Sequence, residues 1–160
     1  MTASRSPVWH PFTQHALAPE PPMVVRGQGA WLETDAGGRI LDAISSWWVI
    51  THGHCHPRIV AAIAEQAGQL DQVIFAGHTH PAAEALARGL VAMTPEGLDH
   101  VFFSDSGSTA VEVALKMAAG YWRHTGEQRT RILALEHGYH GDTIGTMSVG
   151  ARGVYNAAYE

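Results

Sequence analysis

A short apolar run, a loop of small residues and a helical stretch follow one another at residues 101–124, and this junction constrains the fold more than any other feature. Residues 101–104 predict a β-strand, and after the loop SDSGSTA the pattern predicts a helix over residues 109–124. Further along, residues 131–135 predict a second strand that ends in the loop HGYHGDT. A strand, a helix and a second strand in this order predict a right-handed βαβ unit with parallel strands, and hence an α/β fold.

The N-terminal part of the chain has a different character, because prolines and glycines interrupt it repeatedly. Short apolar runs at residues 24–25, 30–32 and 39–41 predict a small antiparallel meander. A proline at a first helical position and apolar residues at helical spacing then predict a helix over residues 57–70. A second helix is expected over residues 81–93 for the same reasons.

Charge and cysteine content narrow the class of partner. The chain has 10 Lys and Arg residues against 15 Asp and Glu, a net charge of −5, and no basic run. Nucleic acid and anionic membranes are therefore not expected as partners. We expect no signal segment or membrane span, and the single cysteine, Cys55, allows no internal disulfide. These features favour a cytoplasmic protein with a small-molecule ligand.

The loop of small residues has the composition of a phosphate site. Ligands of parallel α/β sheets bind at the carboxyl ends of the strands, where this loop is expected to lie. Ser106, Gly107 and Ser108 would let backbone N–H groups approach an anion at the positive end of a helix dipole. Thr109 is expected to cap the helix, with Glu112 completing a capping box. A plain helix cap without a ligand is the alternative.

The second loop adds an aromatic ring to the predicted site. Gly138 and Gly141 flank Tyr139, so its ring could stack on a flat heteroaromatic group beside the phosphate. A phosphate and such a ring together indicate pyridoxal phosphate. The alternative is that Tyr139 covers the core at the end of a strand.

These motifs carry a resemblance to a known family. The sequence SDSGSTAVEVALKMA followed by HGYHGDT resembles the cofactor half of the class III, fold-type I aminotransferases, and DAGGRILDAISSWW followed by HGHCHP resembles their N-terminal segment. The resemblance covers nearly the whole chain. It implies that residues 1–55 belong to the small domain and residues 56–160 form the first, incomplete part of the large parallel-sheet domain. It also implies pyridoxal 5'-phosphate as cofactor and a homodimer for the complete protein.

Further motifs at residues 9–11 (WHP), 45–48 (SSWW) and 75–80 (FAGHTH) resemble the family members of biotin biosynthesis. Those members transfer an amino group from S-adenosylmethionine to 8-amino-7-oxononanoate and form 7,8-diaminononanoate. Lysine as the amino donor stays open, and another class III aminotransferase, acting on ω-amino acids or diamines, is an alternative.

The resemblance also implies roles for single residues. Gly107 and Ser108 would bind the cofactor phosphate, and Tyr139 would pack on the pyridine ring and face the substrate. Trp47 would form a wall of the substrate pocket, where an indole suits an aliphatic chain, an adenine ring and a sulfonium cation.

Two further positions are implied on the substrate side. Phe12 stands where relatives often have a tyrosine, so the aromatic wall is kept and a hydroxyl is missing. Asp142 would orient a substrate amine.

The catalytic lysine of the family is not expected in this chain. In the resembled family, the Schiff-base lysine and the aspartate that keeps the pyridine nitrogen protonated lie beyond residue 160. Lys116 is the chain's single lysine and follows Glu112 by four residues, where a solvated ion pair is expected. No catalytic residue is therefore assigned, and the 160-residue chain by itself is predicted to be inactive.

Histidine clusters at residues 52–56 (HGHCH) and 78–80 (HTH) suggest metal ligands at first sight. The helix expected directly after the first cluster does not give a preformed ligand set, so no metal site is predicted. A non-catalytic or metal-binding domain remains the alternative from a different functional class.

Overall fold

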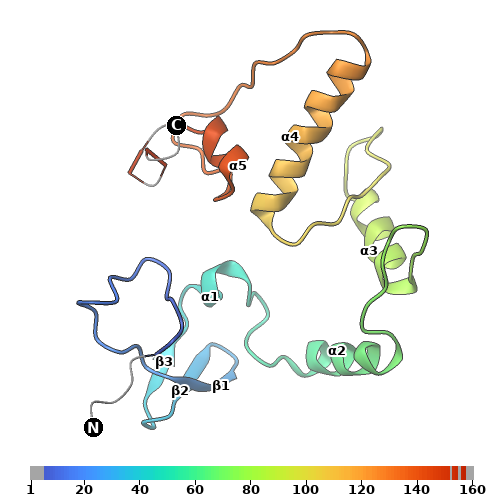
Figure 1. Cartoon of the computed structure of the whole chain (residues 1–160). Helices are drawn as coiled ribbons and strands as arrows, with labels where there is room; N and C mark the ends of the chain where they lie inside the picture. The colour runs from blue at the N-terminus through green and yellow to red at the C-terminus, as the bar shows by residue number, and fades with distance from the viewer. Residues whose placement is uncertain (1–5, 152, 155, 158–160) are drawn as a thin grey trace. The chain divides into compact units, whose positions relative to one another are not determined.

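The computed structural model describes residues 6–151, 153–154 and 156–157 and places the chain in two compact units, Met1–His78 and Thr79–Glu160 (Figure 1). Each unit is built on local structure of a different kind. The first contains a small sheet and the second is helical in its described residues. The domain boundary expected at residue 56 concerns the complete protein and stays a prediction.

The predicted meander is confirmed. Strands β1 (Val24–Gln28), β2 (Trp31–Thr34) and β3 (Arg39–Leu41) form an antiparallel sheet in the order β1-β2-β3. The turn between β2 and β3 is closed by the Thr34 N–H, which donates to the carbonyl of Gly38 at 2.9 Å. An isolated bridge joins Gly29, in the turn between β1 and β2, to His54.

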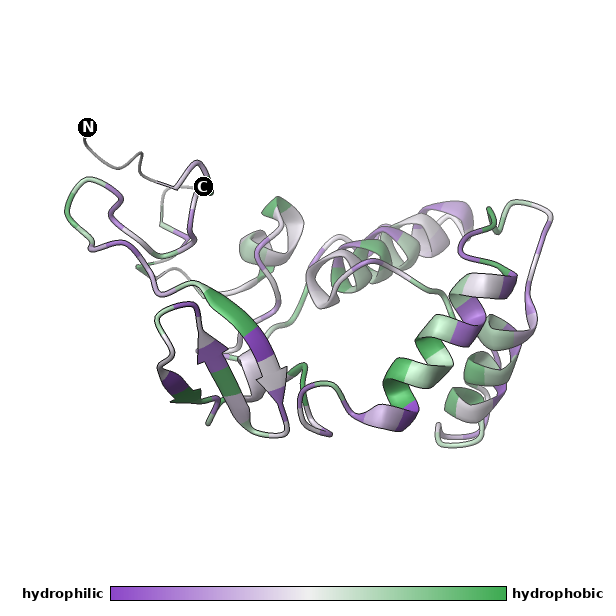
Figure 2. Ribbon diagram, turned by 90° about the horizontal axis from the view of Figure 1, so that it is seen from below, coloured by the Kyte–Doolittle hydropathy of each residue, from purple (hydrophilic) through white to green (hydrophobic). Residues whose placement is uncertain are grey.

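Two elements complete the first unit. The segment labelled α1 (Ser45–Trp48) is a single short turn directly after the sheet, and α2 (Pro57–Gln69) begins where its proline predicts. Helix α2 carries both apolar and polar residues (Figure 2), and its apolar residues Ile59 and Ile63 are exposed. The predicted helix over residues 57–70 is confirmed to within one residue.

The described residues of the second unit form three helices. They are α3 (Pro81–Val91), α4 (Gly107–His124) and α5 (Ile144–Val149), and α5 packs against α4 (Figure 1). The predicted helices over residues 81–93 and 109–124 are therefore confirmed, with ends that differ by two residues. Among the described residues, no helix is long and apolar enough to cross a bilayer.

The two strands predicted on either side of α4 are not formed. Residues 101–104 and 131–135 are irregular, so the βαβ unit and its parallel pairing are absent from the described residues. A strand needs a neighbour to accept its ladder hydrogen bonds, and here the apolar side chains remain in solvent: Leu133 is 99% exposed and Phe102 63%. Both segments have the apolar composition of a buried strand, but within the described part of the chain no strand pairs with either.

Candidate functional site

The N-terminus of α4 forms the first part of the candidate site. Ser106 is the N-cap, and its hydroxyl accepts the N–H of Thr109 at 3.1 Å, while the Thr109 hydroxyl accepts the N–H of Ser106 at 2.9 Å. This capping box corrects the prediction that Thr109 caps the helix with Glu112. Because the helix begins two residues earlier, Gly107 and Ser108 lie in its first turn, where N–H groups have no intrahelical acceptor.

The second loop approaches this helix end very closely. The N–H of Asp142 donates to the Ser108 hydroxyl at 2.9 Å. Gly141 is buried, and a Cβ added there would lie 2.7 Å from the Ser108 hydroxyl oxygen. The structure therefore brings the two predicted loops together without a strand pairing to hold them.

Tyr139 and Asp142 form a pair at the edge of this junction. The Tyr139 hydroxyl donates to a carboxylate oxygen of Asp142 at 2.7 Å, and Tyr139 is 75% exposed. The hydrogen bond to Asp142 raises the pKa of Tyr139, partial burial adds to this, and the Ser108 hydroxyl opposes it. The phenol therefore stays protonated near neutral pH, with its ring face open to a ligand.

Glu112 ties the second loop to α4 from below the helix end. Its carboxylate accepts the Thr143 hydroxyl at 2.6 Å and the N–H of Thr146 at 3.1 Å. Thr146 is 1% exposed, which makes this the most buried polar cluster of the described residues. Glu112 was expected to pair with Lys116, but in the structure its carboxylate accepts hydrogen bonds from this loop.

In the first unit, the predicted substrate residues Phe12 and Trp47 lie side by side. Their ring centroids are 5.6 Å apart and the rings are tilted by 46°. Trp47 is 56% exposed, so the pair presents an aromatic surface to solvent. The six predicted site residues thus form two groups, each assembled within its own unit.

Trp47 owes its position to an unusual backbone. Residues 45–48 all have positive φ, from 45° at Ser46 to 70° at Trp48, and with ψ of 51° and 49° the central residues Ser46 and Trp47 are left-handed helical. For L-amino acids this conformation costs roughly 1–2 kcal/mol per residue, because Cβ crowds the next carbonyl oxygen. No glycine relieves the strain in this left-handed turn, so the surrounding contacts must hold it.

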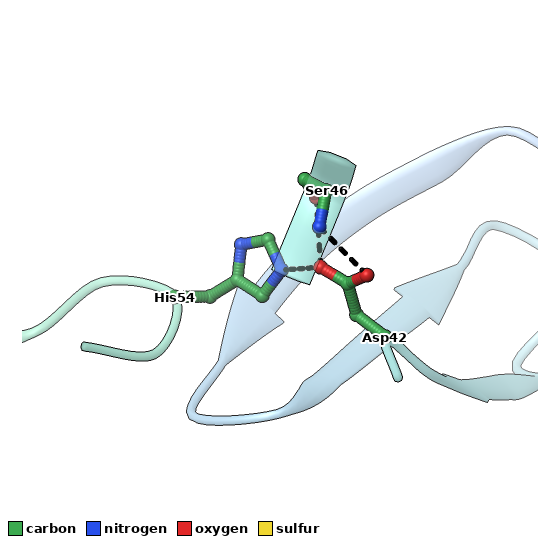
Figure 3. Close-up of polar contacts among 3 residues, drawn as sticks. All are labelled: Asp42, Ser46 and His54. Atoms are coloured by element: carbon green, nitrogen blue, oxygen red, sulfur yellow. Dashed lines mark hydrogen bonds and ion pairs between the residues drawn. The ribbon is translucent and has the colours of Figure 1, made fainter. Parts of the chain in front are cut away.

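The Asp42 side chain supplies several of these contacts (Figure 3). One of its carboxylate oxygens accepts the N–H of Ser46 at 2.8 Å, and the other accepts the Ser46 hydroxyl at 2.7 Å. The His54 Nε2 lies 2.7 Å from the same carboxylate. The Ser46 N–H above all, then the Ser46 hydroxyl and His54, lower the pKa of Asp42 to about 2.

Acid is expected to release the left-handed turn. Because the pKa of Asp42 falls from 3.8 to about 2, its contribution is complete above the first value and is lost as the pH drops toward the second. The near-UV circular-dichroism difference between the protein and its Trp47→Phe variant should shrink over this range. In Asp42→Asn the difference should be smaller at neutral pH and follow only general acid unfolding. If the circular-dichroism difference had the same pH dependence with Asp42 and in Asp42→Asn, Asp42 would not be the group that holds the turn.

Several histidines of the two clusters contact other residues in the structure. His54 contacts Asp42, and His80 caps α3 by accepting the Ala83 N–H at Nδ1, 3.4 Å away. The rings of His52 and His56 meet edge to face at 6.4 Å. Within the described part of the chain, no three His, Cys, Asp or Glu side chains are grouped as metal ligands.

Sequence reasoning missed the residues that hold the site together. Asp42 and His54 lie within motifs that carried the family resemblance, but no role was assigned to either. A weak local signal existed for Asp42, since an aspartate near a Ser-rich turn often bonds backbone N–H groups. Glu112 had no such signal, because its partners lie 31 and 34 residues away.

Comparison with known proteins assigns the chain to a family. The model of the class III aminotransferases matches residues 13–158. The chain belongs to the class III aminotransferases. The resemblance of its motifs to this family is thereby confirmed over nearly the whole length.

Relatives named adenosylmethionine-8-amino-7-oxononanoate aminotransferase match this class III chain well. The protein of Synechococcus elongatus is 56% identical over 153 residues, which are 96% of this chain and 36% of the relative. That of Mycobacterium leprae is 46% identical over 149 residues, 89% of this chain and 34% of the relative. The chain therefore spans about a third of the length of these relatives.

Solved structures of the family share the fold. The adenosylmethionine-8-amino-7-oxononanoate aminotransferase of Methanocaldococcus jannaschii matches with a TM-score of 0.84 at 39% identity, over 89% of this chain and 33% of that one. An amine transaminase from an uncultivated Pseudomonas species, in its PLP-bound form, gives 0.85 at 39%, over 95% and 35%. The class III chain thus has the fold of the N-terminal portion of fold-type I transaminases, as expected.

Proposed function

We propose that this chain is the N-terminal portion of a pyridoxal-phosphate-dependent aminotransferase of biotin biosynthesis. The complete enzyme would transfer an amino group from S-adenosylmethionine to 8-amino-7-oxononanoate and give 7,8-diaminononanoate. The observation that carries the proposal is the 56% identity to the Synechococcus elongatus relative of that name over 96% of the chain. A homodimer and a cytoplasmic location belong to the same proposal.

The geometry around α4 fits pyridoxal phosphate. Gly107 stands in the first helical turn, where its N–H has no intrahelical acceptor and can bind an anion, and a Cβ added there would meet nothing within 4 Å. The Ser108 hydroxyl accepts the Asp142 N–H, and its own hydrogen, which interacts with Tyr139 here, can turn to donate to a phosphate oxygen. The exposed face of Tyr139 can stack on the pyridine ring.

When bound, the cofactor supplies an electron-withdrawing ring that stabilises negative charge on the carbon bearing the transferred amino group. The residues of this chain bind and orient the cofactor. Asp142 accepts the Tyr139 hydroxyl and so fixes the ring that covers the pyridine. The other Asp142 oxygen can accept a hydrogen bond from a substrate amine and so orient it. The lysine that performs proton transfer would come from the part of the enzyme beyond the matched third.

The aromatic pair of Phe12 and Trp47 fits the proposed substrates. An exposed indole can cover the aliphatic chain of the acceptor and attract the sulfonium cation of the donor. Phe12 extends this apolar surface, with the ring centroids 5.6 Å apart. Without a hydroxyl, Phe12 contributes packing and no hydrogen bond.

A direct assay tests the proposed reaction. The complete enzyme that carries these residues, supplied with pyridoxal phosphate, should form 7,8-diaminononanoate from 8-amino-7-oxononanoate with S-adenosylmethionine as donor. The isolated chain should form none. The similarity to the amine transaminase favours a second candidate, a transaminase of simple amines. Turnover of an alkylamine, without product from S-adenosylmethionine or lysine, would support that candidate instead.

Replacing Ser108 tests the phosphate site. Ser108→Ala removes a hydrogen bond to a charged oxygen, so the complete enzyme should bind pyridoxal phosphate about tenfold to a hundredfold less tightly. Titration followed by the absorbance of the bound cofactor measures the change. Ser148→Ala is a matched control, since the Ser148 hydroxyl donates to the Ile144 carbonyl inside α5. Equal affinity of both variants would remove Ser108 from the site.

A further inference from the structure

The left-handed turn at residues 45–48 presents the proposed substrate residue Trp47, yet the local sequence does not favour its backbone. None of its residues is glycine, and two are tryptophans. Strained backbone of this kind persists only where surrounding structure enforces it, and it concentrates at functional sites. A group outside the turn must therefore hold this backbone in place.

Backbone hydrogen bonds stabilise only part of the turn. The Ser45 N–H donates to the carbonyl of Asp42 at 3.2 Å, and the Trp48 N–H donates to the carbonyl of Ile44 at 2.9 Å. Neither bond engages Ser46, whose φ is the smallest positive value of the four. The N–H and hydroxyl of Ser46 both donate to the Asp42 carboxylate instead (Figure 3).

The Asp42 carboxylate is itself fixed by the sheet. It follows β3 directly, and its side chain is 6% exposed. His54, 15% exposed in its side chain, contacts the carboxylate oxygen that also accepts the Ser46 hydroxyl. The His54 backbone is anchored by two hydrogen bonds to Gly29 in the β1–β2 turn, at 2.7 and 3.0 Å. A rigid meander thus positions the acceptor that the turn needs.

We propose that Asp42 is a positioning residue for the substrate pocket: held by His54, it enforces the left-handed turn through Ser46 and so fixes the Trp47 indole beside Phe12. This inference rests on the proposed function for the role of Trp47. The Asp42 side chain bonds to Ser46 and His54, so it acts on substrate through the backbone of the turn. Its loss should weaken substrate binding more than turnover.

The test combines a removal with a rescue in the complete enzyme. Asp42→Ala should raise the KM for 8-amino-7-oxononanoate at least about tenfold, the effect of losing one hydrogen bond to a charged group, with a smaller change in kcat. Pyridoxal phosphate affinity should stay the same, because its proposed ligands lie in the other unit. Adding Ser46→Gly should lower the KM several-fold again, since glycine adopts positive φ without strain.

Two controls separate this role from a general loss of folding. Asp35→Ala removes an exposed carboxylate from the neighbouring β2–β3 turn and should leave the KM unchanged. Asp42→Asn keeps one acceptor oxygen and should raise the KM by a smaller factor, and it provides the test if Asp42→Ala does not fold. Unchanged KM in Asp42→Ala and Asp42→Asn, or no recovery with Ser46→Gly, would overturn the proposal.

A readout that needs no turnover distinguishes this proposal from the proposed function. The near-UV circular-dichroism difference between each protein and its Trp47→Phe partner reports the fixed indole alone. It should be lost in Asp42→Ala and return in the double variant, even if the enzyme uses other substrates. A full difference signal in Asp42→Ala would overturn the positioning role whatever the reaction is.

Discussion

Replacing Gly141 with alanine is expected to lower pyridoxal phosphate affinity of the complete enzyme roughly 100-fold, because the added Cβ separates the two loops of the cofactor site. That atom would lie 2.7 Å from the Ser108 hydroxyl oxygen, 2.8 Å from Ser108 Cα and 2.8 Å from the Thr146 hydroxyl oxygen. Two of these neighbours cannot move aside easily, since Ser108 Cα belongs to the first turn of α4 and Thr146 is 1% exposed.

Backbone strain adds to the steric effect at Gly141. Its φ of +127° is a conformation that residues with a Cβ rarely adopt. Gly126→Ala is the matched control, because Gly126 also has a positive φ, +82°, but a Cβ there meets nothing within 4 Å. Cofactor titration and thermal unfolding of both variants separate the clash from the strain. Similar losses in the two variants would contradict the close approach of Gly141 to Ser108.

The elements that sequence reasoning predicted well are those fixed by local chemistry. Pro57 and Pro81 occupy first helical positions of α2 and α3, where a missing N–H costs nothing, and apolar residues recur at helical spacing behind them. The turn at residues 35–38 likewise fixes the β2–β3 pairing through neighbours in the sequence. No distant contact is needed for either.

The strand predictions fail for the opposite reason. Residues 101–104 and 131–135 have the apolar composition of buried strands, but pairing depends on partners elsewhere in a sheet. The described residues supply none, so the composition alone does not produce a ladder. The residues after each segment still meet, because Ser108 and Gly141 are joined through side chains and close packing.

The same difference between local and distant contacts applies to the site residues. The loop composition around Gly107 and Tyr139 predicted a cofactor site because small residues let backbone N–H groups approach a phosphate and an aromatic ring can stack on a cofactor. The supporting residues were missed because their roles arise only from folding. Asp42 holds a left-handed turn that contains no glycine to predict it, and Glu112 binds a loop that is distant in sequence.

Glu112→Ala is expected to destabilise the second unit by about 3 kcal/mol, because two hydrogen bonds to a charged acceptor are lost together. One of the freed donors is the N–H of Thr146, which is buried with its residue 1% exposed and would have no replacement from water. Since Thr143 and Thr146 begin α5, the loop that carries Tyr139 should also loosen, and cofactor affinity of the complete enzyme should fall. Thermal unfolding and cofactor titration measure the two effects.

Two further variants isolate the role of the Glu112 carboxylate. Glu112→Gln keeps one oxygen that can accept from both threonines, so it should lose less than half of the stability lost by Glu112→Ala. Glu136→Ala removes a carboxylate that is 84% exposed at the start of the same loop and should change stability by no more than about 0.5 kcal/mol. If Glu112→Ala behaves like Glu136→Ala, the buried carboxylate does not hold the loop against α4, and Gly141 and Ser108 alone must join the two halves of the cofactor site.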